Sequence, residues 1–152
     1  MRAVVQRVSS ASVQVDDRIV GEIGAGILAF VGVERGDGHA DAEYIAGKIR
    51  DVRIFEEPTD PAKRLNRSVQ EVGGAVLVVS QFTLTADCRK GRRPSFDAAE
   101  APEIARQLVD EVADLLRRAG LTVATGEFQA TMKVALVNEG PVTLLLDSRK
   151  KI

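Results

Sequence analysis

The side chains best suited to chemistry form one short polar segment, Ser80-Gln81-Phe82-Thr83-Leu84, which directly follows the apolar run Ala75–Val79. Hydroxyl, amide and backbone N–H groups come together there, at the point where a buried strand is expected to end. Such groups can hold the oxyanion that forms during acyl transfer. The two hydroxyls could equally satisfy local backbone groups, so this segment alone does not identify a reaction.

The sequence offers no evident base to activate a nucleophile. The single histidine, His39, is expected at the edge of a surface helix and lies far in sequence from Ser80 and Thr83. Cys88, the single cysteine, falls in a polar loop without an obvious base. Because a triad requires a histidine within hydrogen-bond reach of the nucleophile, we do not expect one here.

Metal and nucleotide sites are also not expected. One histidine and one cysteine fall short of a tetrahedral zinc set. The chain lacks a Walker-type phosphate loop, and Gly21, Gly24 and Gly26 do not form a dinucleotide fingerprint between a strand and a helix. We therefore predict no metal and no cofactor.

Length and composition predict a single domain over residues 1–152, since 45% of the 152 residues are hydrophobic. The chain shows neither a signal-type apolar core at its start nor an apolar run approaching ~20 residues, so a cytoplasmic protein is expected, with no membrane partner. The formal net charge of −1 gives no global attraction to nucleic acid, so any RNA contact must be local. Two basic clusters could provide one: Arg89, Lys90, Arg92 and Arg93, and Arg149, Lys150 and Lys151.

Alternation of apolar and polar residues predicts strands and a hairpin over residues 2–23, with the turn at Asp16-Asp17. The continuous apolar run Ile27–Val33 predicts a strand buried on both faces. From about His39 the period becomes helical, and four apolar residues share one face: Ala42, Ile45, Ile49 and Val52. Ile54-Phe55 could form a brief strand before an irregular loop that carries two prolines.

After the strand at Ala75–Val79, a second helix is predicted from Pro102 to Gly120. Its predicted buried face comprises Ile104, Leu108, Val112 and Leu115. Three strands should follow, at Leu121–Phe128, Thr131–Val137 and Val142–Leu146, with Asn138-Glu139-Gly140-Pro141 as the turn between the last two. Strands at both ends of the chain and two strand-helix units between them predict an α/β fold whose helices cover one face of the sheet.

Several segments, taken together and in order, resemble the D-aminoacyl-tRNA deacylase family, also known as the D-tyrosyl-tRNA(Tyr) deacylase family. Two resemble its signature motifs: Ser80-Gln81-Phe82-Thr83-Leu84 and Asn138-Glu139-Gly140-Pro141-Val142-Thr143. Further matches are Met1–Val8, Gly21–Gly26 and Arg93-Pro94-Ser95-Phe96, so the resemblance covers essentially the whole chain. The stretch from Glu56 to Arg67 looks less typical and carries an extra proline.

The resemblance implies a single-domain, mixed β/β/α layered architecture with two main helices, and a homodimer whose active sites lie at the dimer interface. It implies that Gly140-Pro141 is a cis peptide that enters the partner's site, captures the amino group of the D-substrate and excludes L side chains. Arg7 would brace the Gly-Pro carbonyls, and Asn138 belongs to the same motif. Ser80-Gln81-Phe82-Thr83 would line the pocket.

The implied reaction is hydrolysis of the ester in D-aminoacyl-tRNA, which releases free tRNA and the D-amino acid in chiral proofreading of translation. The N–H groups of Phe82 and Thr83 would hold the oxyanion, while the neighbouring ribose hydroxyl of the tRNA assists, which removes the need for a protein base. Thr83 as a covalent nucleophile is the competing assignment. Because glycine has no side chain to exclude, glycyl-tRNA should also be cleaved.

Two alternatives to this function are a related proofreading enzyme with different amino-acid selectivity and a catalytically silent RNA-binding relative. The intact Ser80–Thr83 and Gly140-Pro141 motifs argue for D-selectivity. A pure RNA-binding module would be expected to show basic composition or stacking aromatics, whereas aromatic residues are 4% of this chain.

Overall fold

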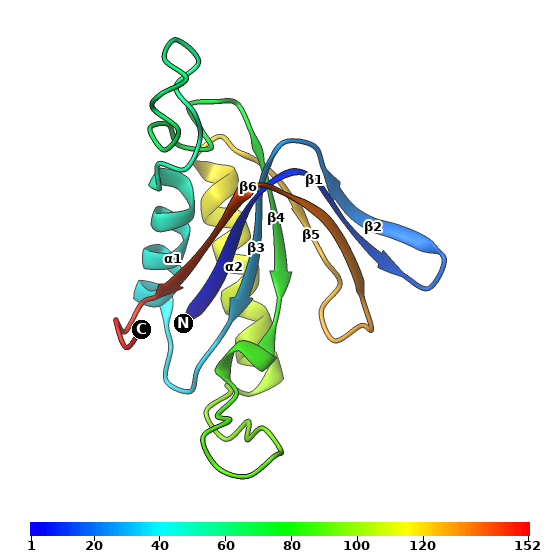
Figure 1. The fold of residues 1–152 in the computed structure, drawn as a ribbon. Coiled ribbons are helices and arrows are strands. Elements are labelled where there is room, and N and C mark those ends of the chain that lie inside the picture. The colour runs from blue at the N-terminus through cyan, green and yellow to red at the C-terminus, as the bar shows by residue number, and fades with distance from the viewer.

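The computed structural model describes residues 1–152 and contains one mixed sheet with two long helices (Figure 1). The strand order is β2 (Arg18–Ile23), β1 (Arg2–Val15), β3 (Gly26–Gly32), β4 (Ala75–Ser80) and β5 (Thr122–Thr125). The last strand, β6 (Lys133–Asp147), pairs with β1 outside this order. The predicted α/β class with two main helices is confirmed.

The long strand β1 connects the two parts of the sheet. Its first half pairs antiparallel with β3 and its second half pairs antiparallel with β2, while β6 follows the other edge along both halves. The predicted hairpin is confirmed, with Asp16 in the left-handed region at φ 53°. Aspartate tolerates this conformation better than most residues do.

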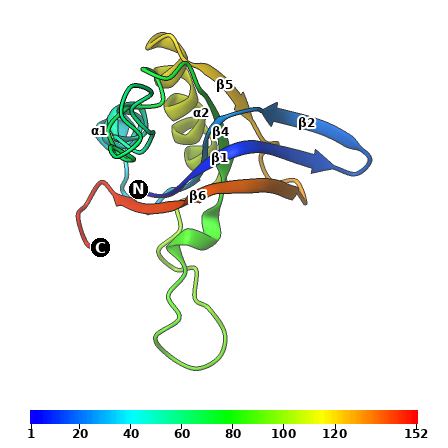
Figure 2. The same ribbon diagram turned by 45° about the horizontal axis from the view of Figure 1, so that its top comes forward.

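The strands β3, β4 and β5 are parallel, and each connection between them contains a helix. Helix α1 (His39–Asp51) joins β3 to β4, and α2 (Pro102–Arg118), which has proline in its first turn, joins β4 to β5. Figure 2 shows both helices on the same side of the sheet. Since the carboxyl ends of parallel strands meet at one edge, Ser80 and the residues after it emerge there together with the end of β3.

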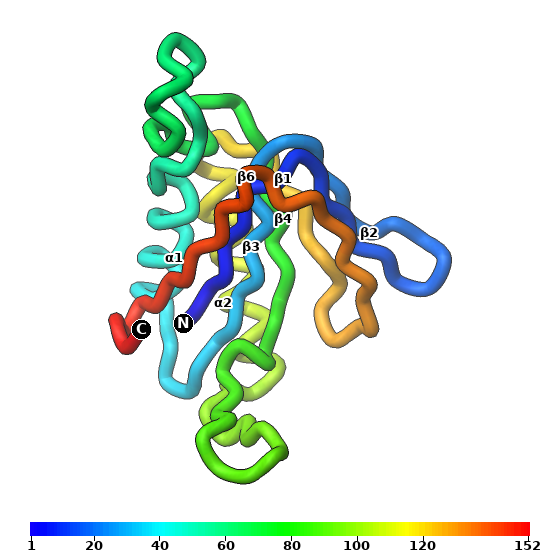
Figure 3. Tube along the Cα trace, viewed as in Figure 1, coloured from blue at the N-terminus to red at the C-terminus, as the bar shows by residue number.

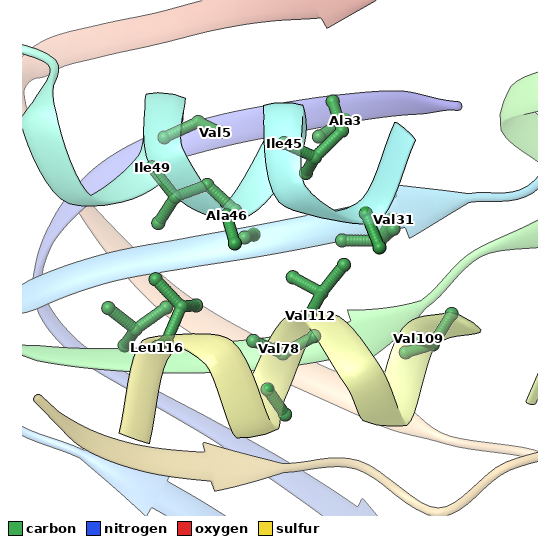
Figure 4. Close-up of a cluster of buried hydrophobic side chains, with 14 of the residues drawn as sticks. Ala3, Val5, Val31, Ile45, Ala46, Ile49, Val78, Val109, Val112 and Leu116 are labelled. Atoms are coloured by element: carbon green, nitrogen blue, oxygen red, sulfur yellow. The ribbon is translucent and has the colours of Figure 1, made fainter. Parts of the chain in front are cut away.

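The main core lies between the two helices and the sheet (Figure 4). Alternate strand residues face it, among them Val5 of β1, Val31 of β3 and Val78 of β4. The helices contribute buried side chains at helical spacing: Ala42, Ile45, Ala46 and Ile49 from α1, and Ala105, Leu108, Val109, Val112, Ala113 and Leu116 from α2.

A second core lies on the opposite face of β3 and β4, where Leu28, Leu77 and Val79 are buried. The second half of β1, with β2 and the first half of β6, curves over this face and adds Val8, Ala11, Val13 and Ile23. The ends of the curved sheet approach so closely that a Cβ on Gly21 would lie 2.2 Å from the Thr125 carbonyl oxygen. The protein is thus layered as strands, strands and helices.

Three details of the predicted elements are wrong. β6 is one continuous strand, and Asn138-Glu139-Gly140-Pro141 lies within it instead of forming a turn between two strands. β5 ends at Thr125, so residues 126–132 form a loop. On α2, Ile104 is 44% exposed because the buried face begins at Ala105.

The two ends of the chain lie side by side (Figure 3), and the backbone N–H of Ser148 donates to the Met1 carbonyl at 2.9 Å. The Met1 amino group forms a buried ion pair of 2.8 Å with Asp37. Neither helix is both long and apolar enough to cross a membrane.

Candidate active site

The polar segment predicted as a site continues directly from β4 and bends sharply. Ser80 pairs with Val31 of β3, and the Gln81 N–H donates to the Val31 carbonyl at 2.8 Å, which extends the parallel ladder by one step. Residues Phe82–Thr85 then form a single turn of 3₁₀ helix, η1. The turn therefore starts at a fixed point on the sheet.

The η1 turn leaves two backbone donors without a partner in the chain. The Leu84 N–H donates to the Gln81 carbonyl at 3.2 Å, as the third N–H of a 3₁₀ turn should. The first two N–H groups of such a turn, those of Phe82 and Thr83, have no acceptor within it. Neither has a backbone or side-chain acceptor outside it. Two adjacent donors are thus free to bind a negatively charged oxygen.

Three residues that the sequence did not indicate hold this turn in place. The buried Thr85 hydroxyl donates to the Phe82 carbonyl at 2.8 Å, and an Arg2 guanidinium N–H donates to the Leu84 carbonyl at 3.2 Å. Gly32 lies beneath the turn, where an added Cβ would be 2.9 Å from the Gln81 carbonyl oxygen and 2.9 Å from the Leu84 Cβ. A glycine inside a predicted strand is a known signal of such close backbone approach.

A pocket of about 840 Å³ opens beside the turn. Its aromatic wall contains Phe82 and Phe96, whose ring centroids are 5.1 Å apart at an interplanar angle of 57°, and Phe128. The other lining residues come from the segment after β3, the end of β4, the segment before α2 and its first turn, the loop after β5 and the start of β6: Val33, Arg35, Ser80, Gln81, Ala99, Glu100, Ala101, Pro102, Ala105, Gln129, Ala130, Met132 and Val134.

The charged residues of the pocket lining are Arg35 and Glu100. The pKa of the Glu100 carboxyl is lowered from 4.5, first because the Ala101 N–H donates to it and second because the Gly36 N–H does. A carboxylate stabilised in this way is a weak proton acceptor, whereas an effective general base has a pKa near the working pH. The lining therefore contains no group tuned to act as a base near neutral pH.

Ser80, Gln81 and Phe82 line the pocket, but Thr83 does not. The Gln81 side-chain amide donates to the Thr83 hydroxyl oxygen. A donated hydrogen bond does not remove a proton from that hydroxyl, as a base would. His39 also lies outside the lining and contacts Glu43 and Glu111 on the two helices.

The other predicted residues form a second group, around a bulge in β6. Between the pairs Gln6–Thr143 and Val8–Asn138, β1 advances by two residues and β6 by five, so residues 139–142 leave the ladder. Asn138 closes this bulge, because its amide donates to the Thr143 hydroxyl at 3.0 Å and its side-chain oxygen accepts the Val142 N–H at 3.2 Å.

The bulge presents Gly140 and Pro141 on the surface, joined by a cis peptide bond. The Arg7 side chain lies beneath it and donates to the carbonyl of Glu139 at 3.0 Å and to that of Ile54 at 2.6 Å. Arg7 thus holds the carbonyl of the residue before Gly140. A Cβ at Gly140, whose φ is +119°, would lie 2.5 Å from an Arg7 guanidinium nitrogen.

The two groups lie at opposite ends of β3. Gly32, beneath the η1 turn, pairs with Arg2, whereas Arg7, beneath the bulge, pairs with Ile27. Five residues of extended strand separate these positions, which corresponds to about 17 Å. Neither Gly140 nor Pro141 lines the pocket of its own chain.

The comparisons with known proteins cover nearly the whole chain. Residues 4–147 match the model of the family described as D-Tyr-tRNA(Tyr) deacylase. The chain belongs to this family. Its family membership and its class, a deacylase acting on aminoacyl-tRNA esters, are confirmed as predicted.

Two relatives named D-aminoacyl-tRNA deacylase are similar to this chain over nearly its whole length. That of Syntrophotalea carbinolica is 57% identical over 150 residues, which cover 99% of each chain. That of Roseiflexus sp. is 58% identical over 148 residues, covering 97% of this chain and 94% of the relative.

Two solved structures share the deacylase-family fold. One, titled "c-Myc DNA Unwinding Element Binding Protein", superimposes with a TM-score of 0.90 at 36% identity and covers 97% of this chain and 98% of its own. The other, titled as a probable eukaryotic D-amino acid tRNA deacylase, has a TM-score of 0.79 at 21% identity over 95% and 97% of the two chains. The predicted family-type fold is confirmed.

Proposed function

We propose that this protein hydrolyses the ester of D-aminoacyl-tRNA at the pocket beside the η1 turn, releasing free tRNA and the D-amino acid. The observation that carries the proposal is the pair of free N–H groups at Phe82 and Thr83, on the turn beside a pocket without a tuned base. A donor pair of this kind can stabilise the oxyanion of an ester's tetrahedral intermediate.

Water is the nucleophile in this mechanism. Its oxygen bonds to the ester carbonyl carbon, the carbonyl oxygen becomes the oxyanion held by the two N–H groups, and the bond to the ribose oxygen then breaks. The vicinal ribose hydroxyl of the terminal adenosine relays the proton from the water to the departing ribose oxygen. The substrate thus supplies the group that the pocket lacks, while the protein contributes position and preorganised donors.

The aromatic wall suits the terminal base of the tRNA. Single-stranded nucleotides are commonly bound by stacking on phenylalanine rings. Phe82 is 57% exposed and Phe96 is 37% exposed, so both residues are accessible to a ligand. A base stacked there places its ribose and the ester next to the backbone donors of the same turn.

The Gly140-Pro141 bulge of a second copy completes the site and selects the D-substrate. The bulge is exposed and contributes no residue to the pocket of its own chain, so in this proposal it serves the pocket of another copy. It lies on the edge strand β6, which also exposes Val137 at 55% and Leu145 at 65%. Exposed apolar side chains on a strand edge favour pairing with another chain, which suits a homodimer.

A filter made of backbone explains both why L-aminoacyl-tRNA should be excluded and why glycyl-tRNA should not be. A mismatch of one methylene in an apolar pocket discriminates by only ~1–3 kcal/mol, whereas a fixed backbone wall excludes an L side chain by steric overlap. Glycine presents no side chain to that wall, so glycyl-tRNA should be cleaved as well. The role in the cell is chiral proofreading of aminoacyl-tRNA in the cytoplasm.

The proposal is tested by following ester loss from D-tyrosyl-tRNA and L-tyrosyl-tRNA with the purified protein, with and without a chelator. We expect release of D-tyrosine alone, at a rate that the chelator leaves unchanged. Equal release of both enantiomers would refute selection by Gly140-Pro141. Absence of release from either substrate would refute the hydrolytic function itself.

A further inference from the structure

A basic loop projects from the molecule directly next to the candidate active site (Figure 1). Its base is closed by two backbone hydrogen bonds, of 2.8 and 2.9 Å, between Asp87 and Ser95. Residues 88–94 extend beyond this closure and are all exposed. We call residues 88–94 the basic loop.

The loop carries uncompensated positive charge. The Arg89 guanidinium lies 2.7 Å from the Asp87 carboxylate, and its hydrogen bonds lower the pKa of that carboxyl to about 2, so the pair is ionised and neutral overall near pH 7. The side chains of Lys90, Arg92 and Arg93 form no ion pair or hydrogen bond in the chain. Three free cations therefore stand on one loop of a protein whose formal net charge is −1.

The position of the loop links this charge to the pocket. Phe96 follows the loop closure by one residue and packs against Phe82 of the η1 turn. Arg93 and Arg92 are three and four residues before Phe96, so they lie within about 10–13 Å of the aromatic wall along the chain. This is close to the screening length of ~8–10 Å at physiological salt.

We infer that the basic loop binds phosphates of the tRNA adjacent to the terminal nucleotide. This inference rests on the proposed function, since a terminal base on Phe82 and Phe96 places the preceding phosphates outside the pocket mouth. Arg92 and Arg93 contact these phosphates and hold the acceptor end while the ester occupies the pocket. Because the protein as a whole repels RNA weakly, this local field supplies a large part of the attraction.

The test compares two double-arginine variants of the full chain. Arg92→Ala/Arg93→Ala removes two free cations of the basic loop, and Arg117→Ala/Arg118→Ala removes two exposed arginines at the far end of α2, outside the pocket. Each is assayed on D-tyrosyl-tRNA over a range of salt concentrations, with kcat and KM determined separately. Circular dichroism checks that both variants are folded.

We expect the basic-loop variant to raise KM about tenfold at low salt with kcat unchanged. The slope of log kcat/KM against log salt should become shallower by about 1.5, because two phosphate contacts are lost. The α2 variant should behave like the wild type. An unchanged KM and an unchanged salt slope in the basic-loop variant, or a fall in kcat alone, would overturn the inference. A wild-type protein without activity would instead overturn the proposed function.

Discussion

In the proposed reaction, Phe82 and Thr83 contribute through their backbone, and their side chains serve other purposes. Their N–H groups are the first two of the η1 turn and have no partner in the chain. The Phe82 ring forms part of the pocket wall, while the Thr83 hydroxyl accepts a hydrogen bond from the Gln81 amide. At the scale of single residues, catalysis should therefore depend little on the identity of side chain 83.

Thr83→Ala tests this assignment. The N–H of residue 83 is kept, so kcat on D-tyrosyl-tRNA should stay within about tenfold of the wild type, since losing one oxyanion donor would lower it by ~10²–10³. Single-turnover ester hydrolysis measures the effect. A folded but fully inactive variant would instead identify Thr83 as a covalent nucleophile.

Glu100→Gln tests the absence of a protein base. Removal of a general base lowers the rate by ~10²–10⁴. For Glu100→Gln we expect kcat to change by less than about threefold, as measured by single-turnover hydrolysis at pH 7. A loss of a hundredfold or more in the folded variant would make Glu100 the base and contradict substrate assistance.

The same variant makes a prediction about stability and pH. Because the pKa of Glu100 is lowered on folding, its carboxylate stabilises the fold above pH 4.5, and this contribution is lost as the pH falls below that value. Thermal melts should therefore show a smaller fall in Tm for Glu100→Gln than for the wild type between pH 5 and 3. An identical fall in both proteins would contradict the lowered pKa.

At the scale of elements, the site depends on how closely the η1 turn packs on β3. Gly32→Ala places a Cβ 2.9 Å from the Gln81 carbonyl oxygen, a contact that forces the turn to move. We expect kcat to fall at least about tenfold, because a displacement near 1 Å can lower rates by ~10². Overpacking of this kind destabilises a protein by ~1–3 kcal/mol.

Gly47→Ala in α1 is the matched control for Gly32→Ala. An added Cβ there meets nothing within 4 Å, and alanine favours a helix over glycine by ~0.8–1 kcal/mol. The control should keep full activity and melt slightly higher, as measured by calorimetry. Equal activity in the two variants would show that the turn does not need its close contact with Gly32.

The elements were predictable wherever local patterning decided them. The apolar run at Ile27–Val33 is β3, and the helical spacing from His39 is α1. Residues 138–141 were wrongly predicted as a turn because their composition is typical of one. Pairing with β1 on both sides of these residues keeps β6 continuous through the bulge. Ile104 fits the helical period, but tertiary packing turns the buried face toward Ala105.

The candidate site was predictable in part. Resemblance indicated Ser80–Phe82, which do line the pocket, but it could not reveal contacts between residues distant in sequence. Arg2 and Leu84 are such a pair, and their hydrogen bond is fixed only when β1, β3 and the η1 turn assemble. Phe128 joins the wall from a loop that was predicted as strand.

At the scale of the whole molecule, the separation of the two motifs is the central feature. The η1 turn lies over one end of β3, and Arg7, which holds the Gly140-Pro141 bulge, pairs with the other end, about 17 Å of strand away. Under the proposed function, each complete site therefore requires two copies, with one copy supplying the donors and another the chirality filter.

Mixing of two defective subunits tests this requirement most directly. Phe82→Pro removes one donor N–H and the aromatic ring, at the first position of η1, where proline is tolerated. Pro141→Glu obstructs the exposed tip of the bulge. Each variant alone should be inactive on D-tyrosyl-tRNA. After co-expression and random pairing, half of the dimers contain one subunit of each variant. In such a mixed dimer one of the two sites combines the intact η1 turn of one subunit with the intact bulge of the other. We therefore predict about a quarter of the wild-type activity for the co-expressed population. If the purified mixed dimer stays as inactive as either parent, the bulge does not complete a second copy's site and the proposed two-copy site is wrong.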